Sequence, residues 1–107
     1  MYATRWEVLI AARDKHDIVE IVTWNDYGES SYIGPIKGAL PNCQAWVDGF
    51  DHTAWLDITA YYAHAYKTGS YPAVTKDAVY LWSRPHPKDA ESSDSIDKPS
   101  NYQMVSY

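Results

Sequence analysis

Residues 18–24 read IVEIVTW, and the polar run NDYGES follows at residues 25–30. Five of the seven residues in the first run are β-branched, which favours an extended backbone. A nearly continuous apolar run of this length is typical of a strand whose two faces are both covered, as in parallel sheets. The asparagine, aspartate, glycine and serine that follow are typical turn residues. The two runs therefore indicate a buried strand that ends in a polar turn.

The segments on either side of these runs predict two helices. Residues 2–14 place apolar side chains at helical spacing on one face. A second stripe with this spacing predicts a helix that starts at Asp51 or His52 and is closed by Gly69 in the left-handed conformation. The stripe, which we expect to be a buried face, consists of Trp55, Ile58, Tyr62, Ala65 and Tyr66.

A second strand is predicted at residues 78–83, which read AVYLWS, whereas residues 31–50 are predicted to be an irregular loop. Helices that alternate with buried strands indicate an α/β protein with parallel strands. Two strands and two helices cannot enclose a stable core by themselves. We therefore expect residues 1–87 to be a slice of a larger α/β sheet, and residues 88–107 to be a polar C-terminal tail or linker.

The composition excludes some classes of function. The chain has 107 residues, and its 9 basic and 14 acidic residues give a formal charge of −5, which argues against nucleic-acid binding and against an anionic membrane as partner. No apolar run approaches the ~18–20 residues that span a bilayer, and the first residues do not resemble a signal peptide. The single cysteine, Cys43, cannot form a disulfide within the chain, so in a secreted protein its partner would lie elsewhere.

Two carboxylates, Asp26 and Glu29, lie three residues apart in the turn after the first predicted strand. In α/β sheets and barrels, reactive groups lie just beyond the carboxyl ends of the strands. Gly28 would allow a sharp turn that points Glu29 towards the same opening as Asp26. Glycoside hydrolysis requires such a pair, because one carboxylic acid protonates the leaving oxygen while the other carboxylate activates water or attacks carbon. Aromatic residues nearby that could pack on a pyranose ring are Trp24, Tyr27 and Tyr32.

The same residues also have plainer interpretations. An aspartate after a strand often forms an Asx turn, and a glutamate in a loop is usually solvated. A metal site that joins the pair to His52 or His86 has no support from ligand spacing. Cys43 lacks a placed histidine base that would make it a nucleophile. Tyrosine and tryptophan are also frequent core residues once their polar groups are satisfied.

Four separated stretches resemble glycoside hydrolase family 71, the fungal α-1,3-glucanases or mutanases. They are residues 19–35, 51–56, 65–72 and 81–88, which read VEIVTWNDYGESSYIGP, DHTAWL, AYKTGSYP and LWSRPHPK. The resemblance extends over residues 5–100. One departure is Ser31, which stands where the family commonly has a histidine after the Glu-Ser pair. If that histidine helps to bind sugar, sugar binding is weakened in this chain.

The resemblance implies that this chain is a fragment of a (β/α)8 TIM barrel, comprising its last strands and helices. It also implies endo hydrolysis of α-1,3-glucan with inversion, without a metal or other cofactor. The family's catalytic pair falls on Asp26 and Glu29. We assign Glu29 as general acid, because its longer side chain reaches the leaving oxygen more easily, and Asp26 as general base. The residues expected to bind substrate are Trp24, Asn25, Tyr27, Tyr32, Trp82, Arg84 and His86.

The family is usually secreted or bound to the fungal cell wall, so α-1,3-glucan is the expected partner. A chain of this length corresponds to about a quarter of a barrel. We therefore expect it to be inactive alone and to expose barrel edges through which it could associate. Two alternatives remain open: a non-catalytic carbohydrate-binding remnant, whose aromatic residues hold glucan without cleaving it, and an inactive truncated gene product.

Overall fold

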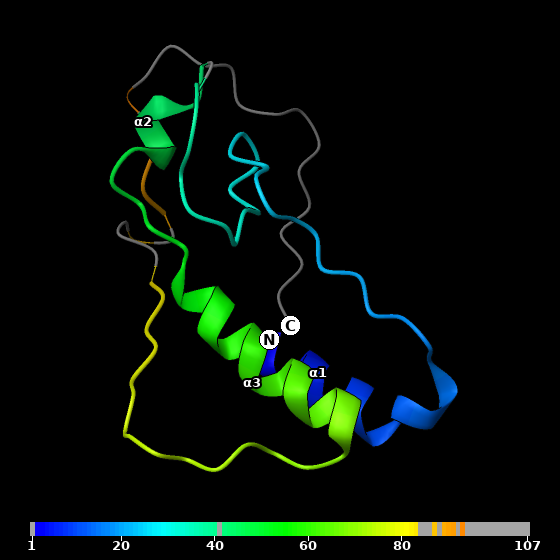
Figure 1. Ribbon diagram of the computed structural model, residues 1–107. Helices are drawn as coiled ribbons and strands as arrows, with labels where there is room; N and C mark the ends of the chain where they lie inside the picture. The colour runs from blue at the N-terminus through cyan, green and yellow to red at the C-terminus, as the bar shows by residue number, and fades with distance from the viewer. Residues whose placement is uncertain (1, 41, 84–86, 88, 92, 94–107) are drawn as a thin grey trace.

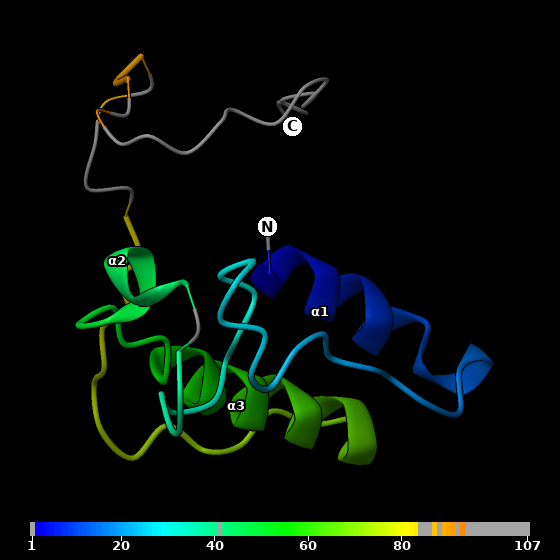
Figure 2. The ribbon, with the colours of Figure 1, turned by 90° about the horizontal axis from the view of Figure 1, so that it is seen from above.

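The computed structural model describes residues 2–40, 42–83, 87, 89–91 and 93. Its helices are α1 at Tyr2–Ala11, the short 3-10 helix η1 at Arg13–Lys15, α2 at Gln44–Val47 and α3 at Ala54–Thr68. Helices α1 and α3 lie side by side (Figure 1, Figure 2). The loop that precedes α2, and α2 itself, lie beyond the N-terminal end of α3 (Figure 1).

Helices α1 and α3 pack through aromatic rings. Trp6 of α1 is 4% exposed, and its ring lies 6.3 Å from the nearly parallel ring of Tyr62 and 6.5 Å from the ring of Tyr66. One turn earlier, Tyr2 meets Trp55 edge-on at 4.8 Å. Side chains three or four residues apart share a helix face, so these rings form one continuous contact. The two predicted helices are therefore confirmed, although α1 ends at Ala11 rather than at residue 14. Three residues of the predicted stripe, Trp55, Tyr62 and Tyr66, pack on α1.

The ends of α3 follow from local hydrogen bonds. The Asp51 carboxylate accepts the N–H and the hydroxyl of Thr53, both at 2.8 Å, and forms a separate turn ahead of the helix. The helix therefore begins at Ala54, later than the sequence predicts. At the other end, Gly69 has a φ of 78° and donates its N–H to the carbonyl of Ala65 at 2.8 Å. The predicted left-handed glycine is confirmed.

The predicted strands at residues 18–24 and 78–83 are wrong. The part of the chain that the structure describes contains helices but no strand or sheet. Side chains expected to be buried are open to solvent: Ile18 is 85% exposed, Val79 93% and Leu81 82%. A strand requires backbone hydrogen bonds to a neighbouring segment. Among the described residues, no segment forms such bonds with residues 18–22 or 78–83.

Because the described residues contain no strand, the predicted α/β class is wrong, and so is the predicted fragment of a (β/α)8 TIM barrel. The described residues form a helical pair joined to a long loop instead. The β-branched composition of residues 18–24 favours an extended backbone, but it cannot supply the partner on which a sheet depends. The boundary between residues 1–87 and the tail at residues 88–107 stays a prediction, since most of the tail lies outside the described residues.

A cluster of buried side chains lies within the segment between η1 and α3. Tyr32 is 1% exposed, Val47 of α2 is fully buried, and Cys43 is 4% exposed as a free thiol. Partly buried side chains that pack on this cluster are Tyr27, Ile36 and Leu40. Helix α2 lies within residues 31–50, which the sequence predicts to be irregular throughout. Over the described residues, no helix has both the length and the apolar character that crossing a membrane requires.

Candidate functional site

Residues 23–34, here called the acidic loop, are closed by backbone hydrogen bonds between their two ends. The carbonyl of Thr23 accepts the N–H of Ile33 at 3.0 Å, and the carbonyl of Trp24 accepts the N–H of Gly34 at 2.9 Å. Because both ends of the loop are bonded to each other, the six residues between Trp24 and Ser31 form a compact turn. This turn carries both predicted catalytic carboxylates.

Asp26 organises the tip of the acidic loop. Its Oδ1 accepts the N–H of Glu29 at 3.2 Å, and its own N–H donates to Oγ1 of Thr23 at 2.9 Å. The Oδ1 bond goes to the N–H three residues on, one residue further than in the Asx turn that the sequence offers, but it likewise gives Asp26 a local structural role. Within the described residues, no hydrogen bond reaches the second oxygen, Oδ2, of Asp26. The side chain of Glu29 is exposed, so both residues keep a carboxylate oxygen available for chemistry.

The left-handed residue of the acidic loop is Ser30, directly after Glu29, rather than Gly28 between the two carboxylates. Ser30 has a φ of 56°, in the left-handed region, whereas Gly28 lies outside that region. A Cβ atom on Gly28 would lie 3.9 Å from Oδ1 of Asp26, which is an ordinary contact. Glycine is needed at Gly34, where a Cβ atom would lie 2.7 Å from the carbonyl oxygen of Trp24. The acidic loop is closed by this close approach of the backbone at Gly34 to the backbone at Trp24.

Two residues that the sequence did not assign to the site hold the acidic loop from outside. Trp46 of α2 donates its indole N–H to the carbonyl of Gly28 at 3.0 Å. The ring of His52 stacks on the ring of Tyr32 at 3.8 Å, and Nδ1 of His52 bonds the carbonyl of Tyr32 at 2.8 Å. His52 lies in residues 51–56, one of the stretches that resemble the family, so the resemblance could have indicated this residue. Nothing in the sequence pattern marks Trp46.

The three aromatic residues predicted beside the pair lie in different environments. Trp24 is 57% exposed, so its ring is open to a ligand. Tyr27 is half-buried, and its hydroxyl donates to the carbonyl of Pro35 at 3.0 Å. Tyr32 is buried, and both this burial and the nearby charge of Asp51 raise the pKa of the Tyr32 hydroxyl. Their contribution to sugar binding stays a prediction.

A cavity of about 340 Å³ lies next to the acidic loop, and we call it the loop cavity. Ser30, the neighbour of Glu29, forms part of its wall. The indole rings of Trp55 and Trp82, which also line it, lie 4.9 Å apart. The structure therefore brings one distant predicted residue, Trp82, to the same cavity as the loop. Asn25 is exposed and lies outside the lining, while Arg84 and His86 fall outside the described residues.

Asp51 and His52 add polar groups to the loop cavity. The hydrogen bonds from the backbone and then the hydroxyl of Thr53 lower the pKa of Asp51, so this carboxylate is an anionic acceptor at neutral pH. Aromatic faces with a few hydrogen-bonding groups suit a polyhydroxylated ring. Over the described residues, no group of three or more His, Cys, Asp or Glu side chains is arranged to hold a metal ion. The site thus has the features of a carbohydrate-active protein.

Comparison with known proteins identifies the family. The family model described as "Glycosyl hydrolase family 71" matches residues 1–106. The chain therefore belongs to glycosyl hydrolase family 71, as the resemblance of the four stretches predicts. No solved structure matches the chain.

Three fungal relatives are similar to this chain. A glucan endo-1,3-alpha-glucosidase of Schizosaccharomyces pombe is 46% identical over 99 residues, which cover 90% of this chain and 23% of that protein. A mutanase of Penicillium rubens is 36% identical over 106 residues, or 95% of this chain and 23% of that protein. An ascus wall endo-1,3-alpha-glucanase of S. pombe is 38% identical over 119 aligned positions, or 99% of this chain and 27% of that protein. The chain thus spans about a quarter of the length of the curated relatives it matches.

Proposed function

We propose that the chain carries the catalytic acid pair of an endo-acting, inverting α-1,3-glucanase, with Glu29 as general acid and Asp26 as general base. The observation that supports this most strongly is the bonding of the acidic loop. Both carboxylates lie on one turn, which is closed by backbone bonds and held by Trp46 and His52. Because the backbone that carries both carboxylates is held in this way, only their side chains need to reorient when a glycosidic bond lies between them.

The proposed reaction assigns one proton transfer to each carboxyl group. Glu29, exposed at the tip of the loop, protonates the glycosidic oxygen as the bond to the anomeric carbon breaks. Asp26 keeps Oδ1 on the N–H of Glu29 and uses Oδ2 to take a proton from water. That water attacks the anomeric carbon from the opposite face, which inverts its configuration. Inverting hydrolases place their two carboxyl groups ~6.5–9.5 Å apart to leave room for this water.

The proposed substrate is α-1,3-glucan. The names of three relatives that are 36–46% identical to this chain describe hydrolysis of α-1,3-glucan or a mutanase. One of these names also places its protein in the ascus wall, so we propose a secreted or wall-associated location for this chain as well. The sugar would rest on Trp24 at the loop and on Trp82 in the loop cavity, with Asn25, Tyr27, Tyr32, Arg84 and His86 completing the predicted set.

The experiment uses the longer glucan endo-1,3-alpha-glucosidase of S. pombe. In that protein, the residue that aligns with Asp26 is replaced by asparagine, and the residue that aligns with Glu29 is replaced by glutamine. Release of reducing sugar from insoluble α-1,3-glucan should fall by ~10²–10⁴-fold in each variant. Asp48 of this chain is an exposed carboxylate outside the acidic loop. The variant of the relative with asparagine at the position that aligns with Asp48 is the control, and it should retain full activity. Normal hydrolysis by both loop variants would overturn the assignment of the pair.

A second candidate function is binding of glucan without hydrolysis. The bond from the N–H of Glu29 to Asp26 favours it, because this bond gives Asp26 a structural role that needs no chemistry. The neighbouring indole rings of Trp55 and Trp82, which are tilted by 36° to each other, also offer a sugar platform that does not depend on the acidic loop. Retention of the 107-residue chain on insoluble α-1,3-glucan, with no soluble sugar released over days, would favour this candidate. Loss of retention in the Trp82→Ala variant would place the binding in the loop cavity.

A further inference from the structure

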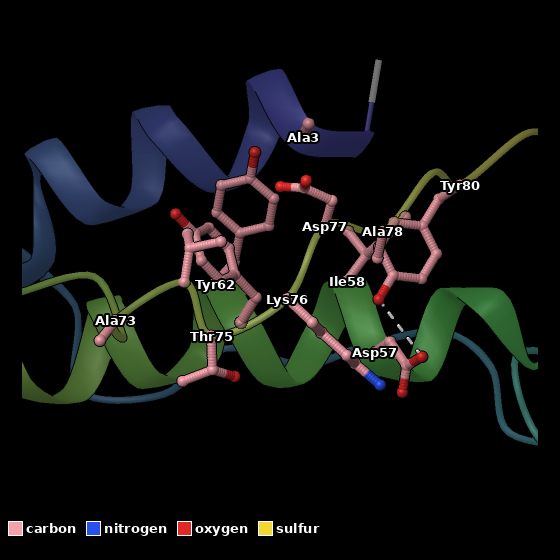
Figure 3. A pocket seen from close by; sticks show the side chains of 12 residues that line it. Ala3, Asp57, Ile58, Tyr62, Ala73, Thr75, Lys76, Asp77, Ala78 and Tyr80 are labelled. Carbon is pink, nitrogen blue, oxygen red and sulfur yellow. Dashed lines mark hydrogen bonds between the residues drawn. The ribbon is translucent and has the colours of Figure 1, made fainter.

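A larger cavity, of about 520 Å³, lies between α1, α3 and the segment at residues 73–80 (Figure 3). We call it the helix cavity. Its volume is within the range of pockets that hold small ligands. Its lining includes no residue of the acidic loop. The helix cavity is therefore separate from the proposed catalytic pair, and the proposed function does not use it.

The helix cavity combines tyrosine rings with carboxylates. Tyr61 and Tyr62 come from α3, and Tyr80 comes from the segment that covers the cavity. The Tyr80 hydroxyl donates to Oδ2 of Asp57 at 3.3 Å and so bridges the segment to the helix (Figure 3). Asp77, from the same segment as Tyr80, adds a second carboxylate to the lining (Figure 3). Tyrosine rings therefore lie within one small volume with strong hydrogen-bond acceptors.

This lining selects a class of ligand by its chemistry. Tyrosine rings accept the apolar C–H face of a sugar, and carboxylates accept hydrogen bonds from its hydroxyl groups. Two carboxylates against the single ammonium of Lys76 leave the wall with a net negative charge, which repels phosphates and other anions. A neutral oligosaccharide can satisfy both the rings and the carboxylates without burying a new charge.

The two cavities lie along the same side of α3. Ile58 contributes to the walls of both. The covering segment is also shared, since residues 73–78 and Tyr80 line the helix cavity whereas residues 81–83 line the loop cavity. A polymer that enters beside the acidic loop could therefore continue along α3 to the helix cavity. A short free sugar would fill one cavity alone.

We propose that the helix cavity is a second carbohydrate site, which takes a short stretch of α-1,3-linked glucan away from the catalytic pair. The choice of glucan rests on the proposed function, whereas the site itself rests on the cavity and its lining. Its role would be to hold an insoluble chain on the protein while another part of that chain lies at the acidic loop.

The test measures binding of an α-1,3-linked glucose tetrasaccharide to the 107-residue chain by two-dimensional amide NMR. The wild-type protein should show shifts at residues 75–78 that saturate with tetrasaccharide concentration. The Ala78→Trp variant places an indole in the helix cavity and should weaken this binding tenfold or more. Val79→Trp is the matched control, because Val79 is 93% exposed and lines neither cavity. Its affinity should stay within twofold of the wild type.

The Asp77→Asn variant keeps the test decisive if Ala78→Trp does not fold. It is nearly isosteric, removes one acceptor charge, and should weaken binding severalfold. Unchanged affinity in Asp77→Asn, or in a folded Ala78→Trp variant, would overturn the proposal. Stronger binding of an organic cation such as choline at residues 75–78 would overturn the assignment to carbohydrate.

The acidic-loop variants separate this proposal from the proposed function. Asp26→Asn and Glu29→Gln in the 107-residue chain should leave the shifts at residues 75–78 unchanged. Binding at residues 75–78, together with normal hydrolysis by the aligned variants of the S. pombe relative, would support the helix cavity and refute the catalytic pair. Loss of hydrolysis in that relative, with no shift at residues 75–78 in this chain, would support the pair and refute the second site.

Discussion

The indole N–H of Trp46 donates to the carbonyl of Gly28 at 3.0 Å, and so ties α2 to the peptide between the two predicted catalytic residues. Helix α2 is itself held in place, because Val47, next to Trp46, is fully buried in the cluster around Tyr32. The conformation of the acidic loop therefore depends on a segment almost twenty residues further along the chain.

Replacing Trp46 with phenylalanine keeps most of the ring but removes the donor to Gly28. One lost hydrogen bond of this kind should lower the free energy of unfolding by about 1 kcal/mol. The amide hydrogens of Ser30 and Ser31 should exchange faster with solvent, because the loop loses an anchor. Urea denaturation and hydrogen exchange measure the two effects. Unchanged exchange at both serines would show that the Trp46 bond does not stiffen the loop.

Replacement by alanine should destabilise the protein at Gly34 but not at Gly28. In Gly34→Ala, the new methyl group would lie 2.7 Å from the carbonyl oxygen of Trp24, so we expect a loss of ~1–3 kcal/mol of stability. In Gly28→Ala, the nearest atom is 3.9 Å away and no strained φ is required, so stability should change by less than about 0.5 kcal/mol. Thermal unfolding of the two variants, followed by circular dichroism, makes the comparison. Equal unfolding temperatures would contradict the close packing.

Tyr32 should contribute to stability mainly through its buried ring. In Tyr32→Phe, the ring stays stacked on His52 and only the hydroxyl bond to the carbonyl of Phe50 is lost, which should cost about 1 kcal/mol. In Tyr32→Ala, the ring itself is removed from a site that is 1% exposed, which should cost ~3–5 kcal/mol. Urea unfolding of both variants measures which of them loses more stability. A larger loss in Tyr32→Phe than in Tyr32→Ala would contradict it.

The pKa of the Tyr71 hydroxyl should lie well above the ordinary value for tyrosine. Its hydroxyl donates to Oε2 of Glu7, and this bond raises the pKa of Tyr71 from 10.0 to about 12. Since the folded pKa is above the unfolded one, the stabilising effect of the bond is complete below pH 10 and is lost as the pH rises through about 12. NMR titration of the Tyr71 ring carbon should show this pKa. In Glu7→Gln it should fall towards 10, whereas Asp57→Asn, which removes the partner of Tyr80, should leave it unchanged.

The exposed apolar side chains of residues 79–82 should promote association of the chain with itself. Val79 is 93% exposed and, unlike Leu81, lines neither cavity, so Val79→Lys can test this surface without altering either site. The wild-type chain should sediment as a mixture of monomers and larger species at high concentration, and the Val79→Lys variant should shift towards monomer. A wild-type chain that stays monomeric and unfolds cooperatively would contradict this expectation. It would also count against the interpretation as an inactive truncated product.

The candidate site could be predicted from the sequence only in part. The stretch that resembles the family identified Asp26 and Glu29 as the residues of interest, and the structure places both on one turn. The sequence could not show that Ser30 adopts the left-handed conformation, or that Trp46 anchors the acidic loop. These features depend on backbone angles and on a contact between distant segments, neither of which leaves a regular pattern in the sequence.

What the sequence determined by itself is the local part of the fold and the membership of the family. Helices α1 and α3 and the glycine that ends α3 depend on hydrogen bonds and side-chain spacing within a few residues. Only the tertiary structure decided that residues 18–24 and 78–83 are not strands and that Tyr32 is buried. A strand and a buried side chain both need partners from other segments of the chain. The same apolar run can therefore be paired or exposed, according to what lies beside it.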